Sequence, residues 1–217
     1  METKSTLRFK RIIITSVLFF AIPFISNILD LIISNSTISY TFSISLIAFI
    51  FIIYNWDLFA LHYNRSKKNI KDTVFYTIVG LILLGTLTFI NQSFIHGYLI
   101  LCDKQTLTRY YGGAFIMIVS HTLSFSLCMM IAYKSTVDRI KLEVSTVQVI
   151  LFSGLIFALL FSIFYVPLDI NLMVSSFLYY SIFFIICSYL YNQCGSFIPA
   201  MISITLIFLF INILQFI

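Results

Sequence analysis

Residues 111–133 read YGGAFIMIVSHTLSFSLCMMIAY, a stretch without a single Asp, Glu, Lys or Arg. A helix needs about 20 apolar residues to cross the roughly 30 Å hydrocarbon core of a bilayer. Lipid offers no partner to backbone N–H and C=O groups, so such a segment must satisfy them internally, as a helix does. The stretch therefore predicts a transmembrane helix.

Six further runs of the same kind surround this one. We expect them at Ile12–Ser34, Ile38–Leu61, Val74–Ile95, Val147–Pro167, Leu172–Tyr191 and Phe197–Ile217. The whole chain is 60% hydrophobic and 10% charged, whereas a soluble domain carries about 25% charged residues. The sequence predicts an all-α, polytopic transmembrane bundle of about seven spans, formed by residues 1–217 as a single domain.

The distribution of basic residues predicts the orientation of the bundle. Eleven of the 13 lysines and arginines fall in the N-terminal tail and in the segments after the second and fourth runs. These segments share one side of the membrane, so the positive-inside rule predicts a cytoplasmic N-terminus. The same rule explains the net charge of +5, and no groove-reading motif points to nucleic acid. We expect a multi-pass cell-membrane protein whose surroundings are the lipid bilayer, with no nucleic-acid partner.

Polar residues within the runs are the first candidates for function, because they are costly in lipid. His121, Ser124 and Cys128 follow one another at helical spacing and share one face. This face is either a metal or proton site, or a neutral histidine that bonds to a neighbouring helix. No second His or carboxylate lies near it in sequence, which favours the structural interpretation, and we expect no metal and no cofactor. Asp30 is within about a turn of a span end and is expected to reach water.

Three short segments in the second half occur in order along the fourth, fifth and seventh runs: MMIAYK at 129–134, FALLF at 157–161 and GSFIPAMISITLI at 195–207. In order, spacing and framing residues, the region 120–216 resembles the CAAX-protease and bacteriocin-processing family of membrane proteases (CPBP, also called Abi). That family carries the patterns E-E-x-x-x-R, F-x-x-x-H and H-x-x-x-N. The corresponding residues here, called the motif positions below, are Met129, Met130, Lys134, Phe157, Phe161, Ser203 and Ile207.

The resemblance implies a protease fold without the protease chemistry. Family members are thought to activate water with the glutamate and histidines, whereas Met, Phe, Ser and Ile cannot act as general acids or bases near neutral pH. We therefore expect no catalytic residue and a pseudoprotease rather than an enzyme. The resemblance further implies a protein that binds and positions another membrane or cell-envelope protein, or that confers bacteriocin self-immunity. A composition rich in Ile, Phe, Asn and Lys favours a bacterial plasma membrane.

Two alternatives remain open from the sequence. The first is an intramembrane CAAX-type protease with displaced catalytic residues, whose cleavage would depend on His121. The second is a small-molecule carrier or the membrane subunit of a transporter, which usually has a polar path at mid-membrane. Within the runs, the face of His121, Ser124 and Cys128 offers such a path.

Overall fold

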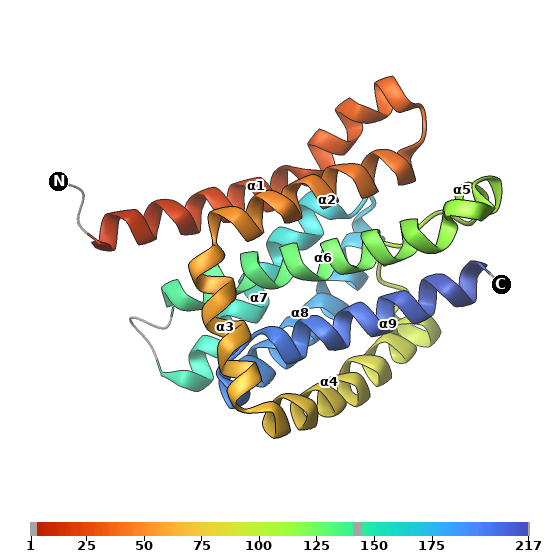
Figure 1. The fold of residues 1–217 in the computed structure, drawn as a ribbon. Coiled ribbons are helices and arrows are strands. Elements are labelled where there is room, and N and C mark those ends of the chain that lie inside the picture. The colour runs from red at the N-terminus through yellow and green to blue at the C-terminus, as the bar shows by residue number, and fades with distance from the viewer. Residues whose placement is uncertain (1–3, 141–144, 217) are drawn as a thin grey trace.

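A computed structural model describes the backbone of residues 4–140 and 145–216, and these residues form helices joined by short connections. No strand occurs in either range. The elements in Figure 1 are α1 (Lys4–Ile33), α2 (Ser36–Tyr54), α3 (Trp56–Lys68), α4 (Ile70–Ile90), the π-helical turn η1 (Asn91–Ile95), α5 (Lys104–Arg109), α6 (Tyr111–Ile140), α7 (Thr146–Tyr165), α8 (Ile170–Cys194) and α9 (Ile198–Phe216). The predicted all-α fold class is confirmed.

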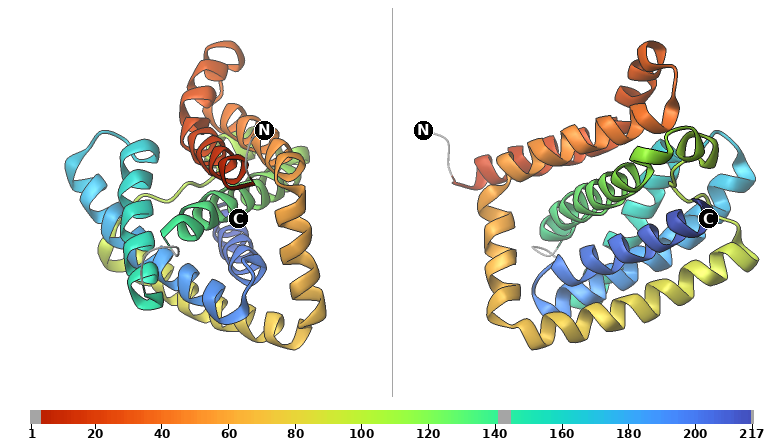
Figure 2. Two further views of the ribbon diagram at one scale, coloured as in Figure 1. Left: turned by 90° about the vertical axis from the view of Figure 1, so that its left-hand side faces the viewer. Right: turned by 45° about the vertical axis from the view of Figure 1, so that its right-hand side comes forward.

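Seven of these elements are long and apolar enough to cross a membrane, as the sequence predicted: α1, α2, α4 with η1, α6, α7, α8 and α9. Helix α6 lies at the centre, between the α1–α2 pair on one side and α9 with α4 on the other (Figure 1). Figure 2 shows α7 and α8 completing the ring around it. The helix that carries His121 and the first motif segment is therefore the most enclosed one.

The second span ends earlier than the sequence suggested. The expected run continued to Leu61, but α2 ends at Tyr54, and Asn55 (φ −113°, ψ 30°) leaves the helical conformation. Helix α3 then crosses the end of the bundle and leads into α4 (Figure 2). Asp57 in its first turn and the basic residues in its last turn make this helix too polar to lie in hydrocarbon.

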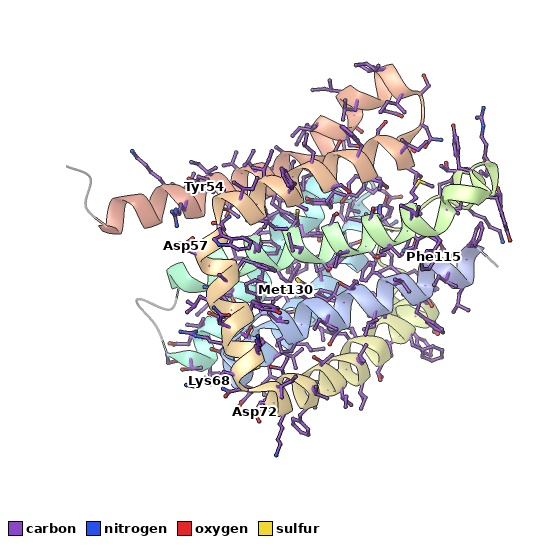
Figure 3. The ribbon with its side chains drawn as sticks, viewed as in Figure 1. Tyr54, Asp57, Lys68, Asp72, Phe115 and Met130 are labelled. Carbon is purple, nitrogen blue, oxygen red and sulfur yellow. The ribbon has the colours of Figure 1, made fainter. Side chains whose placement is uncertain are left out.

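The two ends of the bundle differ in charge. One end, here called the basic end, holds α3 with Arg65, Lys67 and Lys68 in its last turn. Asp57, Lys68 and Asp72 lie at this end in Figure 3, whereas Phe115 lies toward the other. The opposite end, here called the hairpin end, carries the α1–α2 connection and α5 (Figure 1). This separation agrees with the positive-inside pattern, and a cytoplasmic basic end stays a prediction.

Helix α1 bends before it reaches the α1–α2 connection (Figure 2). Pro23 lies inside this helix, and a proline there removes one backbone hydrogen bond and clashes with the preceding turn. The bend separates the last turns of α1 from α7. The space that it leaves is described below.

Candidate functional site

The motif positions lie in the packed interior of the bundle rather than around an open site. Five of them are at most 1% exposed: Met129, Met130, Phe157, Phe161 and Ser203. Lys134 is 5% exposed, and Ile207 is half-buried. Met130 is seen midway along the bundle in Figure 3, surrounded by other side chains. The sequence segments that resemble a protease therefore face inward but enclose side chains instead of solvent.

Phe161, at the position of a family histidine, belongs to an aromatic cluster. Its ring stacks on Tyr165 with centroids 4.5 Å apart and an interplanar angle of 4°, and it lies 4.2 Å from the Tyr180 ring. One turn earlier, Phe157 packs edge-on against Phe184 at 4.7 Å. Aromatic pairs in this geometry contribute about 0.5–1.5 kcal/mol each beyond their burial. The cluster fills the space that a pair of metal-binding or basic imidazoles would need.

Ser203, at the second histidine position, is used in helix packing. Its Oγ lies 2.9 Å from the Pro199 carbonyl and 3.0 Å from the Thr77 carbonyl, so its single proton is shared between α9 and α4. The contact is close because α4 carries Gly80 there: a Cβ on Gly80 would stand 2.5 Å from Ser203 Oγ. The hydroxyl therefore joins two helices and does not face a general base.

Lys134, at the arginine position, keeps the positive charge near the basic end. Its Nζ lies 5.6 Å from the centroid of the Tyr191 ring on α8. A cation over an aromatic face is attracted by the ring quadrupole, by about 0.5–2 kcal/mol depending on burial. Lys134 thus connects α6 to α8.

His121 has both ring nitrogens engaged. Nδ1 lies 3.2 Å from Thr41 Oγ1, and Nε2 lies 3.4 Å from the Ile100 carbonyl. A carbonyl can only accept, so the proton belongs on Nε2, and Nδ1 then accepts from the Thr41 hydroxyl. This arrangement is that of a neutral histidine with no lone pair left for a metal. Within residues 4–140 and 145–216, no three His, Cys, Asp or Glu side chains gather into a metal-binding group.

The other two members of the predicted polar face also contact α2. Ser124 donates to Ser45 Oγ at 3.2 Å, and the Cys128 thiol points to the Ile44 carbonyl at 3.8 Å. The structure brings the three residues together on one side of α6. What they do there is to hold α6 against α2 through polar contacts in an apolar setting.

A cavity of about 360 Å³ lies beside His121, at the bend of α1. We call it the hairpin-end cavity. Its walls come from α1, the start of α2, the loop 96–103, α6 and the end of α7, and include Asn27, Tyr40, Tyr98, Phe164 and Tyr165 together with His121. The sequence singled out His121 but did not predict that Tyr40, Tyr98 and Tyr165 would lie beside it, because they come from three separate segments.

Asp30 is partly exposed, and the expectation that it reaches water stays a prediction. One of its carboxylate oxygens, Oδ1, is buried. It follows Ser26 and Asn27, which line the hairpin-end cavity, by one helical turn. At the hairpin, Asn35 caps α2 by accepting from the Ile38 N–H, and it donates to Thr106 Oγ1. The last turn of α1 is itself exposed, with Leu31 at 84% and Ile32 at 79%.

The loop 96–103 contributes Tyr98, Ile100 and Leu101 to the cavity lining. Hydrogen bonds to side chains hold this loop in place. Asn91 accepts from the Gly97 N–H at 2.9 Å, and Asn212 accepts from the Cys102 N–H at 2.8 Å. Burial raises the pKa of the Cys102 thiol to about 12. The pKa of Asp103 is lowered, first of all by the hydrogen bond that its carboxylate accepts from the Thr106 N–H.

A second concavity lies on the membrane-facing side, between α4 and α9. This α4–α9 groove has a volume of about 630 Å³ and is lined mainly by apolar side chains such as Leu81, Phe89 and Phe210. Gly85 lies in its wall, with no atom within 4 Å of the position that a Cβ would take. Gln92 and Gln215 place amide groups at its hairpin end.

Comparison with known proteins identifies no relative of this chain. No family model, no curated protein and no solved structure matches the chain. The likeness of residues 120–216 to the CPBP membrane proteases stays a prediction that rests on the motif segments themselves.

Proposed function

We propose that this multi-pass membrane protein is a pseudoprotease of the CPBP type, which binds and positions another membrane protein without cleaving it. The observation that carries the proposal is the filled interior at the motif positions. Phe157 and Phe161 occupy it with stacked rings, and Met129 and Met130 are equally buried. A general acid–base mechanism needs a group that titrates near the working pH, and none of these side chains does.

Neither Ser203, a polar motif position, nor His121, which lies outside the motifs, replaces the missing chemistry. A serine becomes a nucleophile only beside a base, and the Ser203 proton is given to carbonyl oxygens. His121 would have to serve a protease with displaced residues, yet its ring nitrogens contact Thr41 and Ile100. These contacts support a binding function over a rebuilt catalytic site.

The α4–α9 groove is where we place the partner, as a single transmembrane helix. Small residues let helix backbones approach closely in lipid, and Gly85 provides such a place, with Thr88 one turn along on the same groove. An acyl chain offers no hydrogen bond to the amides of Gln92 and Gln215, whereas a helix with polar residues at its end does. The resemblance favours a partner in cell-envelope assembly or in self-immunity to bacteriocins.

The test is co-purification of the full chain from its native membrane in mild detergent, with two matched variants. Gly85→Leu fills the groove, and Gly113→Leu adds the same side chain at an exposed position on α6 with equally open surroundings. We expect a stoichiometric membrane protein with the unmodified chain and with Gly113→Leu, and its loss with Gly85→Leu. A partner that remains bound to Gly85→Leu would exclude the groove, and a chain that purifies alone would count against partner binding altogether.

A second candidate, the binding of a small molecule, is favoured by the hairpin-end cavity. This partly open cavity combines a concave volume with polar groups from several helices, as ligand sites commonly do.

A further inference from the structure

We propose that the seam between α1 and α7 binds a lipid with an uncharged, hydroxyl-bearing headgroup, such as a glycerol or a sugar. The acyl chain lies in an apolar groove along the seam, and the headgroup lies in the hairpin-end cavity. The inference takes the second candidate function further and rests on that cavity being a ligand site. It does not depend on a partner helix in the α4–α9 groove, which has other walls.

The groove for the acyl chain lies on the outside of the bundle, between α1 and α7. This α1–α7 groove has a volume of about 340 Å³, and its surface is entirely apolar. Val17 and Phe24 of α1 line it and are 61% and 58% exposed. Both helices are long and apolar enough to cross a membrane, so these side chains face the acyl chains of the bilayer. An acyl chain is therefore the occupant that the surroundings of the groove supply.

The α1–α7 groove and the hairpin-end cavity meet at Phe164, which lines both. The centroid of its ring lies 5.2 Å from that of Phe20 and 6.3 Å from that of Phe24. Beyond Phe24 the lining of α1 becomes polar, with Ser26 and Asn27 in the cavity. Because α1 and α7 both run toward the hairpin end (Figure 1), the apolar part lies deeper in the membrane and the polar part nearer its surface. Lipids have the same order of chain and headgroup.

The length of the α1–α7 groove suits an acyl chain of one leaflet. Its lining on α1 begins at Ser16 and ends at Phe24, which at 1.5 Å per residue is roughly 12 Å along the helix. One leaflet contributes about half of the roughly 30 Å hydrocarbon core. The chain alone gives little selectivity, because lipid tails are as apolar as the groove and no hydrophobic driving force separates them. The headgroup therefore determines which lipid binds.

Neutral hydrogen-bonding groups line the cavity where the headgroup lies. Asn27 and Ser36 are exposed lining residues. Within residues 4–140 and 145–216, neither side chain makes a hydrogen bond to the protein. An amide and a hydroxyl can each both donate and accept. Both residues are therefore available to the hydroxyls of a headgroup.

The charge of the lining favours an uncharged headgroup. Among the described residues that line the cavity there is no Asp, Glu, Lys or Arg, and Asp30 is not one of them. His121 uses its ring nitrogens for Thr41 and Ile100. A phosphate or ammonium group in this cavity would give up water without an opposite charge to pair with, which costs free energy. A hydroxyl needs only hydrogen-bonding partners, and the cavity provides these.

The direct test is native mass spectrometry of the full chain in amine-oxide micelles, with three oleoyl probes compared at the same mole fraction. 1-Monooleoylglycerol carries free hydroxyls, methyl oleate carries none, and oleoyl lysophosphatidic acid carries a charged phosphate. We expect monooleoylglycerol to bind at least about 10-fold more tightly than either of the others, a difference equivalent to about 1.4 kcal/mol. Equal binding of methyl oleate, tighter binding of the phosphate lipid, or no binding of monooleoylglycerol would overturn the proposal.

Variants locate the bound lipid. Ala21→Phe adds a ring inside the α1–α7 groove, and Asn27→Leu replaces the cavity amide by an apolar side chain of similar size. We expect Ala21→Phe to weaken the binding of monooleoylglycerol about 10-fold, and Asn27→Leu to reduce it to the level of methyl oleate. The controls are Gly113→Phe, at an exposed position with open surroundings, and Asn171→Leu, exposed at the start of α8. Unchanged affinity in both site variants, or equal losses in the controls, would contradict the location. The comparison of the three probes on the unmodified chain does not require the variants to fold.

The Gly85→Leu variant separates this proposal from partner binding. It fills the α4–α9 groove and leaves the seam between α1 and α7 unchanged. We expect it to bind monooleoylglycerol as tightly as the unmodified chain does, whether or not a partner helix is lost. A loss of lipid affinity in Gly85→Leu would place the lipid in the α4–α9 groove and would overturn its assignment to the seam.

Discussion

At the scale of single residues, buried apolar side chains occupy most of the motif positions. Met129, Met130 and Phe161 are large apolar side chains in a close-packed interior. Interiors of this density tolerate swaps of similar volume but not the burial of an unpaired charge. The sequence alone could identify these positions, because the residues around them match the CPBP pattern. It could not show that Phe161 meets rings from three other helices, namely Phe19 of α1, Phe125 of α6 and Tyr180 of α8.

The double change Met129→Glu and Met130→Glu, which introduces the two glutamates of the CPBP pattern, should destabilise the bundle. Removing one partner of a buried ion pair costs about 3–5 kcal/mol, and here Phe161 and Ser203 cannot neutralise the carboxylates. Thermal unfolding in detergent, followed by circular dichroism, measures the effect. Met129→Leu with Met130→Leu is the volume-matched control and should cost less than about 1.5 kcal/mol. Unchanged stability of the glutamate variant would mean that a cation or base is within reach of this site.

Lys134→Ala should weaken the contact between α6 and α8. The change removes the cation above the Tyr191 ring, and the expected loss of unfolding free energy is about 0.5–2 kcal/mol. Lys134→Arg keeps the charge over the ring and should retain most of the stability. Equal losses for both variants, measured by thermal unfolding, would assign the effect to shape rather than to charge.

At the scale of elements, the break between α2 and α3 shows the limit of hydropathy. The apolar letters run on to Leu61, so a window of about 20 residues predicts one span. The structure instead ends α2 at Tyr54, and Arg11 of α1 bonds Asp57 of α3 at 2.7 Å across the basic end. Arg11 and Asp57 lie 46 residues apart in the chain, so no local sequence pattern predicts that they pair. Helix boundaries that depend on such long-range contacts cannot be predicted from hydropathy alone.

The pair of Arg11 and Asp57 predicts a pH effect. Partial burial acts to raise the pKa of Asp57, but the hydrogen bond and the charge of Arg11, together with hydrogen bonds from the backbone, outweigh it, so the pKa is lowered. A lowered pKa in the folded state means that the stabilisation is present above about pH 4 and is lost as the pH falls through the lowered value. Both side chains are largely exposed, so its size is about 0.2–1 kcal/mol.

A double-mutant cycle of Arg11→Gln and Asp57→Asn measures this coupling. We expect a coupling free energy at pH 7 that disappears at pH 2 and shrinks in 1 M salt, where exposed charges are screened. Coupling of the same size at pH 7 and pH 2 would show that α1 and α3 are held by packing rather than by charge.

The two glycines that face α9 predict opposite responses to the same substitution. A Cβ at Gly80 would meet Ser203 Oγ at 2.5 Å, whereas a Cβ at Gly85 meets nothing within 4 Å. Gly80→Ala should therefore push α4 away from α9 and lower stability, by about 1–3 kcal/mol. Gly85→Ala should raise stability by about 0.5–1 kcal/mol through helix propensity. Thermal unfolding of the two variants measures both effects. A Gly80→Ala variant more stable than the Gly85→Ala variant would contradict the packing described here.

At the scale of the whole molecule, the number of spans and their order were predictable from composition and run length. Each span satisfies its own backbone, so one local signal is enough to find it. The partners of His121 were not predictable, because Thr41 lies 80 residues away. The hairpin-end cavity could not be predicted for the same reason, since its walls come from several separate segments.

The orientation predicts which end of the bundle faces the cytoplasm. Lys68→Cys at the basic end should react with an impermeant maleimide only after the cells are opened. Arg109→Cys at the hairpin end should react in intact cells. Cys102 provides an internal control, because it is 2% exposed and its pKa is raised to about 12, so it should stay unlabelled near pH 7. The reverse pattern of labelling would invert the topology.

The most direct measurement of partner binding is photo-crosslinking in the native membrane. The crosslinker benzoylphenylalanine replaces Phe210, which is 61% exposed in the α4–α9 groove, or Phe152, which is 50% exposed on α7. We expect position 210 to yield one discrete protein adduct whose own sequence remains uncleaved, and position 152 to yield lipid adducts. Lipid adducts alone at both positions, or an adduct cleaved within its membrane span, would contradict a pseudoprotease that holds another membrane protein.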